Sequence, residues 1–209
     1  MKEQEIRLSE ATVIGAGANM KVFIDPRDEK RCIKILYDEK CLDWARESSY
    51  RKSRRGRSMQ SKLLTEYYGT VKTDLGTGYL FERVIDFDGN PSRELSELLK
   101  HWNEYPDYTL LENILEDILR GMLAEKLVTT SMEYANFMVQ RVTPEYMRIR
   151  VIDNIGTHAK IPIIFYADGL ARNHVKKYFL RLLDDIAKDF PKALPQKLYQ
   201  HLVEYTKHI

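Results

Sequence analysis

The spacing of apolar residues changes at about residue 86, and this change limits the folds open to the chain. Before it, short β-branched runs alternate with turns rich in Gly, Asp, Asn and Pro, which is typical of antiparallel sheets. After it, apolar residues recur three and four positions apart, as in helices that bury one face. We therefore predict an α+β fold with a β-rich lobe (1–85) and a mainly helical lobe (86–209), together one domain.

The first lobe is expected to hold three strands within residues 11–37, a helix over 40–53, and two strands in YYGTVKTD and GTGYLFERVIDF. In the second lobe, FMVQRV and MRIRVI predict a hairpin joined by TPEY. Helices are expected in SRELSELLKHW, LLENILEDILRGMLAEKL, ARNHVKKYFLRLLDDIAKDF and LPQKLYQHLVEYTKHI.

The stretch VIGAGANMKVF has the spacing of a phosphate-binding glycine loop. Gly15, Gly17 and Val22 fit G-x-G-x-x-G-x-V, with Met20 at the third glycine. Glycines let backbone N–H groups approach phosphates closely, although a plain hairpin turn is the alternative. A strand is expected to follow, which argues against a dinucleotide-binding βαβ unit, and no GK[ST] follows as a Walker loop requires.

Lys34 follows in RCIK, on the next expected strand, 17 residues after Gly17. A lysine between isoleucines is commonly a solvent-facing residue, but this one can reach phosphates below the glycine loop. We expect Glu47, on the following helix, to pair with it, with Glu66 as the less favoured acid. The alternative for Glu47 is an i,i+4 pair with Arg51 on an exposed helix face.

Asn136 and Asp153 flank the expected hairpin, one before its first strand and one after its second. The two ends of an antiparallel hairpin lie side by side, so these oxygen ligands are brought together. Magnesium takes one or two such ligands plus substrate phosphates. The alternative is that each residue caps a turn.

The loop TTSMEYAN places Ser131 five positions before Asn136, where the kinase pattern H-R-D-L-x-x-x-N has its catalytic aspartate. A serine hydroxyl can orient an acceptor, but it is not a useful base at neutral pH. Glu133 is the next candidate acid–base group.

Taken together, GAGANMKVFIDPRDEKRCIKILY, TVKTDLGTGYLFERVIDFDGN, TTSMEYAN and VIDNIG resemble the PhoP regulatory network protein YrbL family, small bacterial proteins with a protein-kinase-like fold. The resemblance runs to about residue 165. It implies a two-lobed kinase-like fold and a role in magnesium-responsive regulation.

The resemblance also implies roles for residues in binding ATP and Mg²⁺. The phosphates would meet Gly15, Gly17 and Lys34, adenine the backbone from Glu82 to Val84, ribose Asp86 or Asp88, and magnesium Asn136 and Asp153. Three features depart from kinases: Ser131 replaces the catalytic aspartate, Glu133 replaces a cation, and DNIG is one residue longer than D-F-G. A serine at this position is itself a family trait.

Three functions remain open: an ATP- and Mg²⁺-dependent phosphotransferase without the usual base, a nucleotide-binding pseudokinase that signals through its conformation, and an interaction module that keeps the fold alone. Phosphoryl transfer depends mostly on positioning and charge neutralisation, so a missing base need not abolish it. The phosphate acceptor could be a protein or a small molecule.

Composition narrows the partners. With 33 basic and 31 acidic residues the net charge is +2, which gives no reason to expect nucleic acid. Two cysteines make no disulfide framework, the five histidines lack paired metal spacing, and no run has transmembrane length or signal-peptide character. We expect a cytoplasmic protein. The basic tract 51–57 is either solvated or a contact for an acidic or phosphorylated partner.

Overall fold

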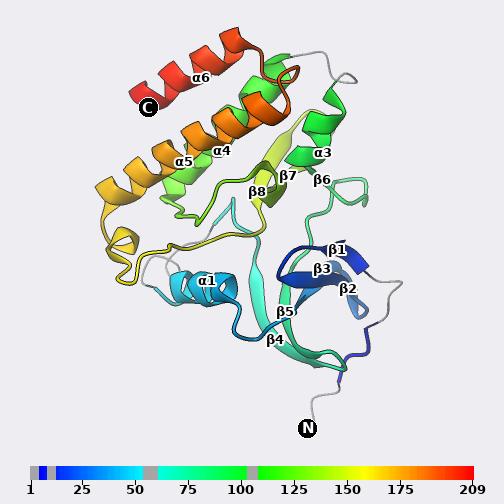
Figure 1. Ribbon diagram of the computed structural model, residues 1–209. Helices are drawn as coiled ribbons and strands as arrows, with labels where there is room; N and C mark the ends of the chain where they lie inside the picture. The colour runs from blue at the N-terminus through cyan, green and yellow to red at the C-terminus, as the bar shows by residue number, and fades with distance from the viewer. Residues whose placement is uncertain (1–4, 9–12, 54–60, 103–107) are drawn as a thin grey trace.

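The computed structural model describes residues 5–8, 13–53, 61–102 and 108–209, which form two lobes (Figure 1). The first is built on an antiparallel sheet of five strands in the order β1-β2-β3-β5-β4. Its elements are β1 (Val13–Ala16), β2 (Met20–Asp25), β3 (Asp28–Leu36), α1 (Leu42–Lys52), β4 (Tyr67–Thr73) and β5 (Gly76–Glu82).

The second lobe combines helices with a small sheet of three strands, β6-β7-β8. Its elements are β6 (Arg93–Glu94), α3 (Leu95–Lys100), α4 (Tyr108–Glu125), the 3-10 turn η3 (Tyr134–Asn136), β7 (Phe137–Arg141), β8 (Met147–Val151), the 3-10 turn η4 (Ile163–Phe165), α5 (Asp168–Asp189) and α6 (Gln196–His208). The helices α4, α5 and α6 lie alongside one another at the end of the molecule away from the five-stranded sheet (Figure 1).

Alternation along β3 separates a small core from the face that looks toward the second lobe. Ile33 and Ile35 are buried with Phe23 and Leu80 on one face of the sheet. Lys34, between them, points to the opposite face, as expected from the period of two in a strand. The β4–β5 turn depends on Gly76, whose φ of 104° is a conformation that side chains disfavour.

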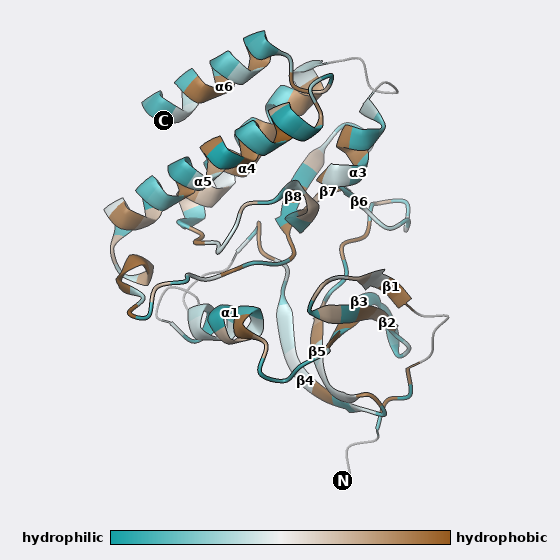
Figure 2. Cartoon of the chain, viewed as in Figure 1, coloured by the Kyte–Doolittle hydropathy of each residue, from teal (hydrophilic) through white to brown (hydrophobic). Residues whose placement is uncertain are grey.

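The larger core lies in the second lobe, around α4. Its buried residues recur at helical spacing, and they are Leu111, Ile114, Leu115, Ile118, Leu119, Met122 and Leu123. The helices α5 and α6 pack on this face and alternate hydrophobic with hydrophilic residues along their length, as half-buried helices do (Figure 2).

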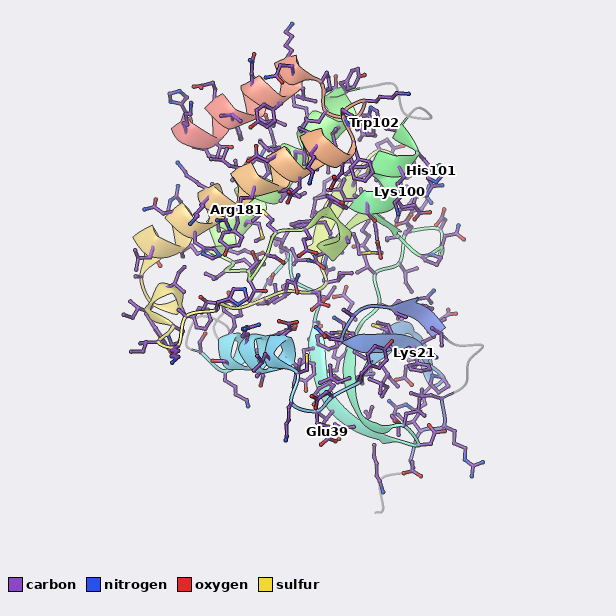
Figure 3. The ribbon with its side chains drawn as sticks, in the orientation of Figure 1. Lys21, Glu39, Lys100, His101, Trp102 and Arg181 are labelled. Carbon is purple, nitrogen blue, oxygen red and sulfur yellow. The ribbon has the colours of Figure 1, made fainter. Side chains whose placement is uncertain are left out.

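Segments of the first lobe complete this core. Tyr50 of α1 is fully buried in it, 5.1 Å from the ring of Phe165. The chain just before β4 hydrogen-bonds to the end of β8: Val151 N–H donates to Leu63 O over 2.8 Å, and Thr65 N–H donates to Val151 O over 3.1 Å. The two lobes therefore share a packed junction. In Figure 3, Lys21 marks the sheet and Arg181 marks α5.

The predicted α+β architecture, with a β-rich first part and a helical second part, is confirmed, and each expected strand and helix has a counterpart. The structure adds the short strand β6 and two 3-10 turns. The division at residue 85/86 stays a prediction. Within the described ranges, no helix has the length and apolar character needed to cross a bilayer.

Candidate functional site

A row of residues crosses the five-stranded sheet on the face toward the second lobe. The strand pairing places Gly15 opposite Val22, Val22 opposite Lys34, and Lys34 opposite Tyr79. Directly opposed residues share a face of a sheet, so Gly15, Val22 and Lys34 lie on the same face. Gly17 follows in the turn, where its N–H donates to Met20 O over 2.9 Å, and it has open space around its Cα.

Lys34 extends from this row to the hairpin of the second lobe. Its Nζ donates to Ile152 O over 2.7 Å and lies 3.9 Å from Asp153 Oδ2. The side chain is 11% exposed, and the ammonium lies 4.7 Å from the centre of the Phe81 ring. The contact therefore places a cation of the first lobe beside a carboxylate of the second.

Asn136 and Asp153 are brought to the same end of the hairpin. Phe137 pairs with Val151, and Ile152 N–H donates to Asn136 O over 3.0 Å, so Asp153 lies one residue beyond the paired position. The buried Nδ2 of Asn136 has no hydrogen-bond partner among the described residues. One amide oxygen and one carboxylate, held by a rigid hairpin, fit the oxygen donors that Mg²⁺ takes together with phosphates.

The two loops at this end are joined by short contacts. Ser131 Oγ donates to Glu133 Oε1 over 2.8 Å and accepts from Asn154 Nδ2 over 2.7 Å. Thr130 N–H donates to Asn154 O over 2.7 Å. Asn154, which follows Asp153, has a left-handed φ of 62°, a conformation that asparagine adopts more readily than most residues.

Glycine at 156 lets α1 approach this segment. Its φ is 122°, and a Cβ there would lie 3.0 Å from the backbone of Arg46. On the opposite side, His174 of α5 contacts the loop backbone, with Nε2 2.7 Å from Thr129 O. Burial lowers the pKa of His174, and the hydrogen bond to Thr129 O, which acts to raise it, offsets this only in part. The lowered pKa favours the neutral ring, with Nε2–H as the donor to Thr129 O.

The expected ion pair between Lys34 and Glu47 is not formed. Glu47 is buried on α1 as expected, but its Oε1 accepts from Arg51 Nε over 2.8 Å. The pair is the i,i+4 alternative within α1. It lies on a buried face of the helix and not on an exposed one, since the Arg51 guanidinium also lies over the rings of Tyr67 and Phe81. Glu66 does not pair with Lys34 either; among the described residues, the acid that pairs with Lys34 is Asp153.

The connection between the lobes uses its carboxylates in internal contacts. Glu82 binds Arg150 of β8 through both oxygens, one of them 2.8 Å from Nη1. Asp86 accepts from Arg141 Nε over 2.7 Å, and Asp88 accepts from the same guanidinium. These hydrogen bonds raise the pKa of Arg141, and the one to Asp86 has the larger effect. The structure does not test a ribose contact by Asp86 or Asp88, so that assignment stays a prediction.

Val84 is buried at this connection, and its carbonyl accepts from Ser92 N–H over 3.2 Å. Nearby, Cys32 lies on the same face as Lys34 and its Sγ is 3.8 Å from Glu82 O. Burial raises the pKa of Cys32 to about 11, so its thiol is protonated at neutral pH.

The sequence reasoning missed the residues that hold the loops in place: Arg150, Asn154 and His174. The first had a signal, since Arg148 and Arg150 alternate on one expected strand and so share a face. A second group joins two helices, with Glu112 and Glu116 on α4 and His201 on α6. Residue spacing within one helix could not predict this contact between helices. Within that group His201 Nε2 is 3.0 Å from Glu112 Oε1, which an ordinary ion pair explains.

Comparison with known proteins identifies the chain's relatives. The family model described as PhoP regulatory network protein YrbL matches residues 6–187. The protein YrbL of Escherichia coli (strain K12) is 34% identical over 161 residues, which cover 76% of this chain and 77% of that protein, and YrbL of Shigella flexneri matches equally.

Solved structures support the fold. The kinase domain of Mycobacterium tuberculosis PknI, in a cysteine-to-alanine mutant form, aligns with a TM-score of 0.50 and 13% identity over 81% of this chain and 71% of the PknI chain. The unmutated PknI kinase domain gives the same TM-score at 12% identity. The chain therefore belongs to the PhoP regulatory network protein YrbL family and has a protein-kinase-like fold.

Proposed function

We propose that this protein binds ATP with Mg²⁺ and transfers a phosphoryl group to an acceptor, as part of magnesium-responsive regulation. The observation that carries the proposal is the contact between Lys34, on the glycine-loop sheet, and Asp153, at the end of the metal-ligand hairpin. A lysine and a carboxylate facing each other across a lobe junction are what a phosphate–magnesium pair requires.

The sheet side of the site would hold the nucleotide. Gly15 and Val22 lie in one row with Lys34, and Gly17 follows in the adjoining turn, so we place the phosphates between this turn and the ammonium. Lys34 neutralises phosphate charge, and the backbone from Glu82 to Val84 supplies hydrogen bonds to adenine. Asn136 and Asp153 would hold Mg²⁺, which when bound neutralises the charge on the phosphates.

The missing aspartate has a substitute in the chain's own residues. Ser131 Oγ donates to Glu133 and accepts from Asn154, which leaves one lone pair for the hydroxyl of an acceptor. As the acceptor oxygen attacks, its proton passes to Ser131 Oγ, and the serine proton passes to the Glu133 carboxylate. Glu133 is then the base and Ser131 the relay, while Asn154 fixes the hydroxyl. Because phosphoryl transfer relies mainly on positioning, this relay need supply only about 3–5 kcal/mol of the barrier.

A nucleotide-binding pseudokinase is the second candidate function. Ser131, in the aspartate position, favours it, since the hydrogen bond to Glu133 also stabilises the loop without any chemistry. The two candidates differ in turnover and agree on nucleotide binding.

ADP formation under millimolar ATP and Mg²⁺ tests the proposal. We expect measurable turnover in the wild type, loss below detection in Asp153→Ala, and a fall of about 10²–10⁴-fold in Glu133→Gln, the range of general-base effects. Wild-type ADP formation that Asp153→Ala leaves unchanged would contradict the site. Binding without turnover would leave the pseudokinase.

A further inference from the structure

A cavity of about 690 Å³ lies apart from the Lys34–Asp153 contact, and neither residue lines it. Its wall is formed by the C-terminal end of α1, residues 61–68 before and within β4, the end of β5, and β8. The volume falls within the range of about 300–1,000 Å³ found for sites of small organic ligands.

Cations outnumber acids in this wall. Arg51, Lys62, Arg148 and Arg150 line it together with Glu66 and Glu82. Two of the cations are already neutralised, because Arg51 pairs with buried Glu47 and Arg150 pairs with Glu82. Arg148 and Lys62 remain without a carboxylate partner among the described residues.

Arg148 is held in place by a neutral group. Its Nε and Nη2 both donate to Gln140 Oε1, over 3.1 and 2.7 Å, and the Gln140 amide is fixed in turn by donating to Ile85 O over 2.6 Å. The guanidinium is therefore oriented without an ion pair of its own, and the nearest compensation is the charge of Glu82 acting from a distance. Burial, and after it the charge of Arg150, lower the pKa of Arg148, so the folded protein pays a cost to keep this side chain charged.

Arg148 and Arg150 are two positions apart on β8 and share a face of the strand. Arg150 is almost fully buried, and its Nε has no hydrogen-bond acceptor among the described residues. Two neighbouring guanidinium groups thus share the single carboxylate of Glu82. An anion in the cavity would relieve their repulsion.

We propose that this cavity binds the phosphate group of a phosphomonoester, with Arg148 and Lys62 as its charged contacts. A guanidinium presents paired donors that match phosphate oxygens, and Arg148 uses only two of its five N–H donors on Gln140. The cavity is far larger than a phosphate ion, and Tyr67 and Tyr68 in its wall offer aromatic surface to an attached organic group. The phosphomonoester could belong to a small molecule or to a phosphorylated side chain.

Titration with inorganic phosphate, free phosphoserine and a phosphoserine peptide, followed through the arginine Nε–Hε signals by NMR, tests this inference. We expect saturable shifts of the Arg148 signal in the wild type. In Arg148→Gln, followed through the Nε–Hε signals of Arg51 and Arg150 in the same cavity, phosphoserine should bind at least about 10-fold more weakly. Arg148→Lys, which keeps the charge without the paired donors, should fall between them. Equal affinity for free phosphoserine and the peptide would assign the site to small molecules, and a clear preference for the peptide would assign it to a phosphorylated protein.

Two control variants keep the outcome interpretable. Arg120→Gln removes an exposed arginine of α4 that pairs with Asp117, and it should leave phosphoserine binding unchanged. Lys34→Met removes the proposed ATP contact and should also leave it unchanged, so failure of the ATP site is distinguishable from failure of this one. Absence of saturable binding in the folded wild type, or equal binding in Arg148→Gln, would overturn the inference.

Discussion

Lys34 Nζ lies 3.9 Å from Asp153 Oδ2, and this contact joins the sheet of one lobe to the β7–β8 hairpin of the other. The same ammonium donates to Ile152 O, so the lysine is anchored at the lobe junction. Two residues 119 positions apart in the chain are thereby brought together at the junction where we propose that ATP and Mg²⁺ bind.

The close approach of α1 to residue 156 predicts that Gly156→Ala destabilises the fold by about 1–3 kcal/mol, the cost of a side chain at such a φ. The Cβ would also press on the Arg46 backbone, 3.0 Å away. Gly17→Ala is the matched control, because nothing lies within 4 Å of its Cβ position and its φ is not left-handed, so it should change stability by less than about 0.5 kcal/mol. Urea unfolding measures both. Equal stability of the two variants would contradict the packing of α1 described above.

The pair between buried Arg150 and half-buried Glu82 predicts a loss of stability in Arg150→Met. Removing the guanidinium takes the donor from Leu64 O and the cation from Glu82, whose carboxylate is 24% exposed and still accepts from Glu66 N–H, so we expect a loss of about 1–3 kcal/mol, less than for a fully buried pair. Arg120→Met, at a 50% exposed pair, should cost less than about 1 kcal/mol. Adding Glu82→Gln to Arg150→Met should recover part of the loss in urea unfolding. No recovery would show that the two side chains do not act as a pair.

The raised pKa of Cys32 predicts a pH dependence of stability. Burial raises the folded-state pKa to about 11 from an ordinary value of 9.0, so the unfolded chain loses its thiol proton first. The free energy of unfolding should therefore fall as pH rises from about 9 to about 11, by about 2–3 kcal/mol relative to Cys32→Ala. Iodoacetamide at pH 8 should also modify partly exposed Cys41 well before Cys32. Native Cys32 reacting as fast as Cys41 would contradict its burial.

The strand and helix pattern of the chain was predictable because it depends on local spacing. Ile33 and Ile35 alternate with Lys34, and the apolar stripe of α4 repeats at helical spacing, so each element could be placed before its neighbours were known. The juxtaposition of Asn136 and Asp153 was also predictable, since one hairpin carries both.

Side-chain partners were less predictable, because several groups compete for each charge. Glu47 had two cations within reach, and the one on its own helix, Arg51, binds it. The contact of Ser131 with Asn154 depends on the left-handed backbone of Asn154 itself, and no local pattern in DNIG predicts that conformation. Of the basic tract 51–57, residues 54–57 lie outside the described residues, so its role stays a prediction.

The Ser131–Glu133 relay predicts the effect of an aspartate at position 131. Ser131→Asp places a carboxylate next to the acceptor, so ADP formation should rise about 10-fold or more, and the substitution should rescue Glu133→Gln. The matched control is Ser131→Ala, which removes the relay and should slow turnover. A wild type that turns over ATP and keeps its full rate in Ser131→Ala would contradict the relay. A pseudokinase would show no turnover in any of these forms.

The most direct test of the nucleotide site is the thermal shift produced by ATP with Mg²⁺ in wild type and Lys34→Met. At 100 times its Kd, a ligand adds about 2.7 kcal/mol, or roughly 5–10 °C for a chain of this size. Lys72→Met is the matched control, because that lysine belongs to the same sheet and is 70% exposed. The account predicts a full shift in wild type and Lys72→Met and little shift in Lys34→Met, each against its own nucleotide-free protein. No shift in nucleotide-free wild type at millimolar Mg-ATP, or an equal shift in Lys34→Met, would contradict it.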